Sequence, residues 1–179
     1  MNNVLVVLED SKMNIYQMDE KTVWEVGRPH KDITPDIGLL SSTVSRKHGK
    51  FESIDGIWFY LDNNKKNGTS YNNKRIGTGI SGRVKPILLN DGDTLIFGGG
   101  QNPHIGANTA WALYLKDGFD GSCRFTDTKG NDGVTFSDGE ETVSLKHPEV
   151  GTVIKKNKGV AIYMGDVTYL MGSMEAKAI

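Results

Sequence analysis

Three short polar clusters carry side chains that can bind an anionic group. They are Gly27-Arg28, residues 43–48 (Thr-Val-Ser-Arg-Lys-His) and residues 67–69 (Asn-Gly-Thr). Arg28 offers a fork of donors, Ser45 a hydroxyl and a backbone N–H, and the Asn67 amide both donors and an acceptor. A phosphate ester carries roughly −1.5 to −2 charges and three acceptor oxygens, so it needs charge-assisted donors that converge from several loops. Phosphate binding is therefore the chemistry that these residue types favour.

Other chemistry finds less support in the sequence. Ser45 and His48 could form a nucleophile and base, but no acid is placed to orient the histidine. Residues 127–133 resemble a calcium loop only faintly, because Lys129 stands where an oxygen ligand is needed. The single cysteine, Cys123, excludes an internal disulfide and a multi-cysteine metal site. We therefore expect no catalytic residue, no metal and no cofactor.

The composition indicates a folded chain without a strong overall electrostatic field. The hydrophobic fraction is 37% and the net charge is −1, so nothing draws the whole molecule to nucleic acid or to an anionic membrane. No apolar window reaches the roughly 18 residues of a membrane helix. We expect a cytoplasmic protein with no nucleic-acid or membrane contact. The abundance of Lys, Asn and Ile hints at a bacterial source.

The elements that must position the clusters have the pattern of strands. Short apolar runs alternate with turn residues, and no stretch of a dozen residues has a helical stripe. Asp55-Gly56, Asn67-Gly68, Asn72-Asn73 and Asp91-Gly92 can adopt the positive φ of tight turns. The spacing predicts an all-β chain with an antiparallel sandwich. The strands expected in its first part are 4–8, 14–18, 23–26, one opening at Phe51, 57–61, 87–89, 94–97 and 111–115.

A stretch rich in Asp and Gly at residues 117–121 (Asp-Gly-Phe-Asp-Gly) indicates a domain boundary. We therefore expect one domain at residues 1–116 and a small β-rich extension, of unknown role, at residues 117–179. The extension has strand-like runs at 122–125, 134–136, 142–145, 152–154, 160–164 and 167–170. At about 60 residues it is marginal as an independent fold.

The order and spacing of the clusters resemble the forkhead-associated (FHA) domain over roughly residues 3–116. Gly27-Arg28 follows a strand, Ser45-x-x-His48 comes next, and residues 67–69 follow an aromatic strand. Residues 89–98 (Leu-Asn-Asp-Gly-Asp-Thr-Leu-Ile-Phe-Gly) are similar to the family's last characteristic segment. The resemblance implies a β-sandwich whose loops at one end hold a phosphothreonine peptide.

The resemblance also implies roles for single residues. Arg28 and Ser45 would contact the phosphate, and Asn67 would hold the main chain of the peptide. Arg46 would assist, while Lys66 stands where the family often has Ser or Thr and would reach phosphate as a point charge. Thr43 would occupy a position that tunes selectivity for the peptide's +3 residue. Structural support is expected from Gly27, His48, Gly68, Thr69 and Asn72.

The hypothesis that follows is a non-catalytic signalling module for protein–protein interaction. It would bind phosphothreonine-containing segments of partner proteins, which implies a Ser/Thr kinase in the same cell. Two alternatives stay open at this point: a phospho-independent structural or oligomerisation domain, and the regulatory N-terminal part of a larger enzyme. The partner's identity, the +3 preference and the oligomeric state are not determined by the sequence.

Overall fold

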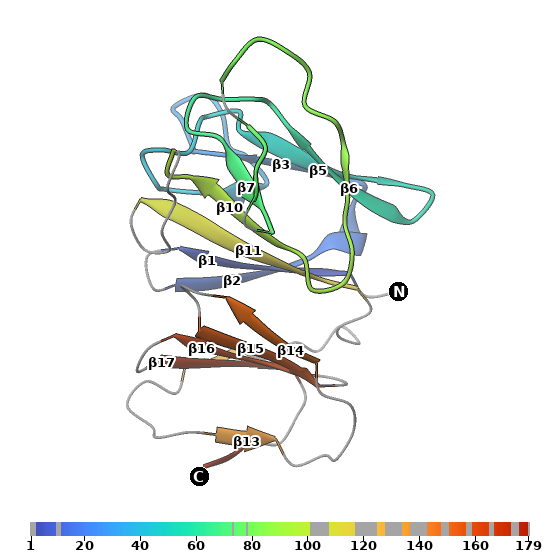
Figure 1. Cartoon of the computed structure of the whole chain (residues 1–179), viewed down its shortest axis with the longest axis vertical. Coiled ribbons are helices and arrows are strands. Elements are labelled where there is room, and N and C mark those ends of the chain that lie inside the picture. The colour runs from blue at the N-terminus through green and yellow to red at the C-terminus, as the bar shows by residue number, and fades with distance from the viewer. Residues whose placement is uncertain are drawn as a thin grey trace. The chain divides into compact units, whose positions relative to one another are not determined.

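The structure is a computed structural model of the chain. It describes residues 3–9, 12–72, 74–77, 79–100 and 108–116, together with the backbone of seven later strands. The chain divides into two compact units, Asn3–Lys116 and Asp117–Ile179 (Figure 1). Each unit is described by itself below.

One layer of the first unit is a six-stranded sheet with the order β2-β1-β11-β10-β7-β8. All its pairs are antiparallel. The central strands β11 and β10 are almost wholly buried, which agrees with their continuous apolar runs. The strands are β1 (Val4–Glu9), β2 (Lys12–Gln17), β7 (Thr69–Tyr71), β8 (Lys74–Arg75), β10 (Thr94–Gly98) and β11 (Thr109–Leu115).

The other layer is a five-stranded sheet with the order β4-β3-β5-β6-β9. Strands β3 and β4 pair in parallel, and the other described pairs of this sheet are antiparallel. Along β6 the buried Trp58 and Tyr60 alternate with side chains of the outer face, as expected for a strand with one face on a core. The strands are β3 (Val23–Gly27), β4 (Ile37–Gly38), β5 (Gly49–Ile54), β6 (Ile57–Asp62) and β9 (Ile87–Leu88).

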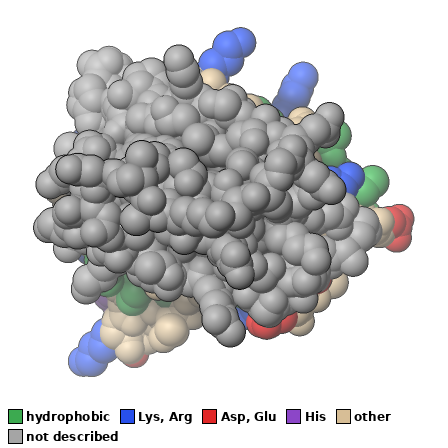
Figure 2. All heavy atoms as spheres, turned by 90° about the horizontal axis from the view of Figure 1, so that it is seen from below, with side chains coloured by type: hydrophobic (Ala, Val, Ile, Leu, Met, Phe, Trp, Pro, Cys, Tyr) green, Lys and Arg blue, Asp and Glu red, His purple; other side chains and the backbone are tan. Residues whose placement is uncertain are grey.

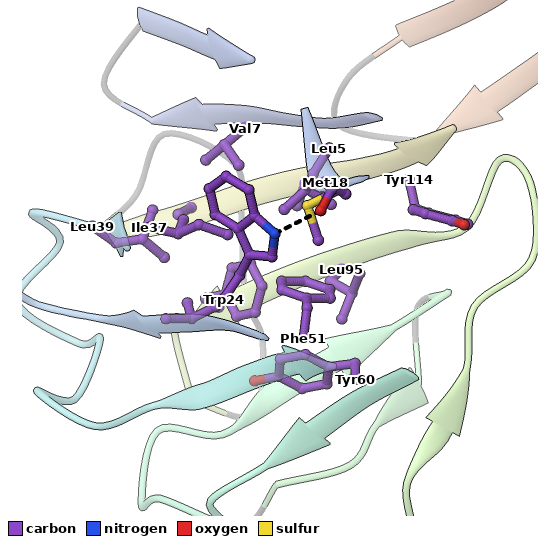
Figure 3. Packing of buried hydrophobic residues seen from close by; sticks show 14 of the residues in the cluster. Leu5, Val7, Met18, Trp24, Ile37, Leu39, Phe51, Tyr60, Leu95 and Tyr114 are labelled. Atoms are coloured by element: carbon purple, nitrogen blue, oxygen red, sulfur yellow. Dashed lines mark hydrogen bonds between the residues drawn. The ribbon is translucent and has the colours of Figure 1, made fainter. Parts of the chain in front are cut away.

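The core lies between these two layers, so the predicted β-sandwich is confirmed. Side chains of both sheets form one buried cluster (Figure 3). Within it the ring of Phe51 packs against Tyr60 and Phe97, with centroids 5.0 and 6.3 Å away. Trp24 buries its indole and donates from Nε1 to the Met18 carbonyl at 2.9 Å, so its one polar group is satisfied. Burying each such side chain contributes about 1.5–3 kcal/mol.

The turn signals of the sequence are found where the chain reverses. Asp55 and Gly56, between β5 and β6, have φ of 51° and 78°, which is the backbone of a tight hairpin turn. Gly68 and Gly92 have φ of 69° and 87°.

Strand ends are less well predicted. Met18 does not extend β2 but begins a 3₁₀ helix, Met18–Glu20, and its side chain is fully buried. The short strands β4, β7 and β8 are absent from the sequence prediction, because their two or three residues are too few to show an alternation.

The second unit is described only within its strands. One sheet has the order β12-β17-β16-β15-β14, and β13 pairs with β18. The calcium-like residues 128–133 and Cys123 lie outside the described residues. No helix in the described part of the chain is long and apolar enough to cross a membrane. The strands are β12 (Phe125–Asp127), β13 (Val134–Phe136), β14 (Val143–His147), β15 (Gly151–Lys156), β16 (Gly159–Met164), β17 (Val167–Gly172) and β18 (Ala176–Ala178).

Candidate functional site

The loops that carry the three polar clusters meet at one end of the sandwich. The backbone of Arg28, just after β3, donates to the Ser45 carbonyl in the β4–β5 loop at 3.0 Å. Gly98 and Gly100, at the end of β10, donate to the carbonyls of Gly68 and Asn67 at 2.9 and 3.0 Å. Backbone hydrogen bonds therefore join the loops after β3 and β4 to each other, and the loops after β6 and β10 to each other.

Arg28 is fixed along its length by the β4–β5 loop. Its Nε donates to the Val44 carbonyl at 3.1 Å, and its side chain is half-buried. The preceding Gly27 is packed so closely that a Cβ there would lie 1.9 Å from the Arg46 carbonyl oxygen. Among the described residues, no protein group pairs with the two Nη groups of Arg28. A guanidinium held at Nε with its outer donors available suits a bound anion.

His48 joins the Ser45 loop to the Gly68 loop. The backbone N–H of Ser45 donates to Nδ1 of His48 at 3.1 Å. Nδ1 is therefore unprotonated, and Nε2 carries the hydrogen of the neutral ring. Nε2 lies 3.0 Å from the Gly68 carbonyl oxygen and 2.9 Å from Oγ1 of Thr69. The ring is completely buried, and this burial lowers the pKa of His48.

Asp62 completes this network, although no sequence pattern had indicated a role for it. Its Oδ1 accepts from the hydroxyls of Thr69 at 2.5 Å and Tyr60 at 2.9 Å. Burial, followed by the Asp62 charge, raises the pKa of Tyr60, so the phenol keeps its proton. Since the Thr69 hydrogen goes to Asp62, Thr69 accepts from His48. Asp62 hydrogen-bonds to Thr69 and not to the histidine, and the histidine accepts from the backbone of Ser45. The arrangement therefore braces the loops and does not activate the serine hydroxyl.

Three further predicted site residues present polar groups to solvent. Asn67 is half-buried, and its backbone carbonyl accepts from the Gly100 N–H. Its side-chain amide has no protein partner in the described part of the chain. The side chains of Arg46 and Lys66 are exposed and likewise unpaired there. Beneath them, Arg75 donates from Nη2 to the Lys66 carbonyl at 2.9 Å, which holds the peptide bond just before Asn67.

Thr43 has its hydroxyl occupied. Its Oγ1 donates to the Asn108 carbonyl and accepts from the Gly99 N–H at 3.0 Å. The hydroxyl therefore ties the β4–β5 loop to the β10–β11 loop. Any effect of Thr43 on a peptide would have to come from its methyl group or from the loop that it holds.

Asn72 lies at the opposite end of β7 from Thr69. Its amide donates to Asp93 at 3.0 Å and accepts from the Thr94 N–H at 2.8 Å, which secures the start of β10. Three strand residues, roughly 10 Å, separate it from the binding loops. The hydroxyl of Tyr71 also donates to Asp93, and burial together with this carboxylate raises the pKa of Tyr71 to about 12. Asn72 thus supports the sheet and not the loops directly.

The charges of the described surface leave many cations without a carboxylate. Two ion pairs are found there, Lys21–Asp36 and Lys50–Glu52. At the edges of the view in Figure 2, Lys and Arg side chains project into solvent. No group of three metal-ligating side chains occurs among the described residues.

A family model described as the FHA domain matches residues 24–98 of the chain. This range includes all the residues of the three polar clusters. No curated protein matches the chain.

The solved structures that are similar to this chain include proteins of yeast and of bacteria. The yeast Pml1 splicing factor has 22% identity over 64% of this chain and 78% of its own, with a TM-score of 0.50. The FHA domain of the CT664 protein from Chlamydia trachomatis has 19% identity over 65% and 98%, with a TM-score of 0.48. The N-terminal FHA domain of S. cerevisiae Rad53p, solved with a phosphothreonine peptide, has 19% identity over 64% and 93%, with a TM-score of 0.47. At such identities the likeness concerns the fold alone.

Proposed function

The chain contains an FHA domain, with the family match at residues 24–98, and from this premise we propose that its end loops bind phosphothreonine-containing segments of partner proteins. Arg28 and Ser45 contact the phosphate, and Asn67 holds the peptide main chain. Arg46 and Lys66 add positive charge beside them. The module is non-catalytic and belongs to cytoplasmic signalling, and its ligand is supplied by a Ser/Thr kinase of the same cell.

The observation that carries this proposal is that some polar side chains of the loops are already bound to protein groups, while others are not. Those of Thr43, His48 and Thr69 are bound to protein groups between the loops. Those of Ser45 and Asn67, and the outer nitrogens of Arg28, have no protein partner in the described part of the chain. Braced loops that present unpaired donors form a preorganised anion site, since little ordering remains to be done on binding.

The proposal is tested by titrating the full chain with one peptide in its phosphothreonine, phosphoserine and unphosphorylated forms. We expect binding of the phosphothreonine form only, or most strongly, since the family also uses the threonine methyl group. Arg28→Ala should weaken it about 10- to 150-fold, because a hydrogen bond to a charged group is worth about 1.5–3 kcal/mol.

Lys74→Ala provides the matched control, because Lys74 is an exposed cation of β8 outside the loops. It should leave the affinity unchanged. Equal binding of the phosphorylated and unphosphorylated peptides would overturn the proposal. A mass that rises with protein concentration and is insensitive to Arg28→Ala would favour a structural, oligomerising role instead.

A further inference from the structure

A groove lies beside the proposed phosphate site, in the segment between β8 and β9. It has a volume of about 510 Å³ and is lined by Asn64 and by residues 76 and 80–87. None of the predicted site residues lines it. The groove is therefore a separate feature of the same domain.

The wall of this groove is built onto the loop that carries Asn67. The Asn64 amide donates to the Ile80 carbonyl and accepts from the Gly79 N–H at 3.1 Å. Gly79 packs against the same loop, since a Cβ there would lie 2.8 Å from the Cα of Lys66. Asn64 thus links the groove to the loop that carries Asn67, three positions further along the chain.

The lining combines an apolar floor with a cationic rim. Ile76 and Ile87 pack on the core cluster, and Ile80 is 72% exposed, which is unusual for a large aliphatic side chain. Arg83 and Lys85 are the charged residues of the lining, and no carboxylate is among its residues. No ion pair with either cation is found within the described residues. Lys65 and Lys66, both exposed, extend the positive charge towards Asn67.

We propose that this groove binds an acidic and aliphatic stretch of the phosphorylated partner, beside its phosphothreonine. The inference rests on the proposed function of the phosphate site and adds the chemistry of the flanking sequence. An aspartate or glutamate pairs with Arg83 and Lys85, and a neighbouring aliphatic side chain covers Ile80. Charges at the rim of a binding groove affect specificity and association rate more than affinity, and added salt screens their attraction for the ligand.

The test uses the full chain and a peptide library with one fixed phosphothreonine and randomised flanking positions. We expect enrichment of Asp or Glu together with an aliphatic residue on one side of the phosphothreonine. An individual peptide with these residues should bind about fivefold more tightly than its Lys- and Ser-substituted counterpart at low salt. At about 1 M salt this difference should disappear.

Two double variants locate the effect. Arg83→Glu with Lys85→Glu should reverse the flanking preference towards Lys, while a short phosphothreonine peptide without the stretch still binds as before. Lys31→Glu with Lys74→Glu changes the net charge equally without touching the groove, and it should keep the acidic preference. Flanking selection that survives in the groove variant, or no flanking selection at all, would overturn the inference.

The outcomes separate this inference from the proposed function. If the phosphate-site proposal fails, no library member binds in a phosphate-dependent manner and Arg28→Ala has no effect. If only the groove inference fails, phosphorylated peptides still bind through Arg28, without a preference that depends on Arg83 and Lys85.

Discussion

His48 connects two loops of the proposed binding site, because each of its ring nitrogens makes a hydrogen bond to a different loop. Nδ1 accepts from the Ser45 backbone, and Nε2 donates towards Gly68 and Thr69. The contact at Nδ1 requires the neutral ring, because a protonated Nδ1 would face the Ser45 N–H as a second donor, whereas Nε2 donates in either form. The histidine is therefore a positioning residue that joins the two loops.

Acid should weaken the fold through His48. Because burial lowers its pKa, the unfolded chain takes up a proton near pH 6.5 that the folded chain accepts only at lower pH. The free energy of unfolding should then fall as the pH is lowered from about 6.5, by at most about 1.4 kcal/mol per pH unit from this group. Urea unfolding of the chain and of His48→Gln between about pH 5 and 7.5 measures the difference in slope.

A second measurement keeps this prediction open to refutation if His48→Gln folds poorly. Nitrogen-15 NMR of the unaltered chain should show the His48 ring as the neutral Nε2–H tautomer at about pH 7, with its titration below the ordinary value of 6.5. A ring that titrates at or above that value would contradict the assignment.

The β6–β7 loop is the element on which the site depends most. It carries Lys66 and Asn67, and it ends at Gly68, where the backbone has φ of 69°. A Cβ on Gly68 would lie only 1.7 Å from the Gly77 carbonyl oxygen. The turn therefore needs glycine both for its backbone angle and for the close approach of the neighbouring chain.

Gly68→Ala should destabilise the domain strongly, and Gly100→Ala separates the two reasons. Gly100 has nearly the same φ, 70°, but a Cβ added there would meet no atom of the described residues within 4 Å. Gly100→Ala should cost about 1–2 kcal/mol from the backbone angle alone. Gly68→Ala should cost about 2 kcal/mol more, because the segment at Gly77 must shift. Urea unfolding of both variants measures this, and equal losses would rule out the steric contribution.

At the scale of the whole molecule, the described strand pairs respect the division into two units. Those of the first unit join strands between Val4 and Leu115, and those of the second join strands between Phe125 and Ala178. We propose that residues 1–116 form a domain that folds and binds its ligand without residues 117–179.

The corresponding prediction concerns a chain that ends at Lys116. Its thermal midpoint should lie within about 4 °C of the first unit's transition in the full chain, a shift that about 1 kcal/mol would cause. Its affinity for a phosphothreonine peptide should be unchanged within about twofold. Calorimetry and titration check both, and a truncated chain that fails to fold would show that the second unit is required.

The local pattern of the sequence was enough for the longer strands and the tight turns of the sandwich, but not for the short strands β4, β7 and β8. Alternation along β6 and the Asp55-Gly56 turn depend on neighbouring residues only, so both are readable without a structure. The donor types of Arg28, Ser45 and Asn67 were also evident, because side-chain chemistry belongs to the residue itself.

The tertiary structure alone decided which polar groups are already bound. Thr43 meets Gly99 across 56 positions, and His48 reaches Thr69 across 21. Asp62 became part of the site only through Thr69, and the groove at Ile80 only through Asn64. A sequence pattern indicates which face a side chain occupies but not which distant group it meets, since that depends on how the two sheets pack.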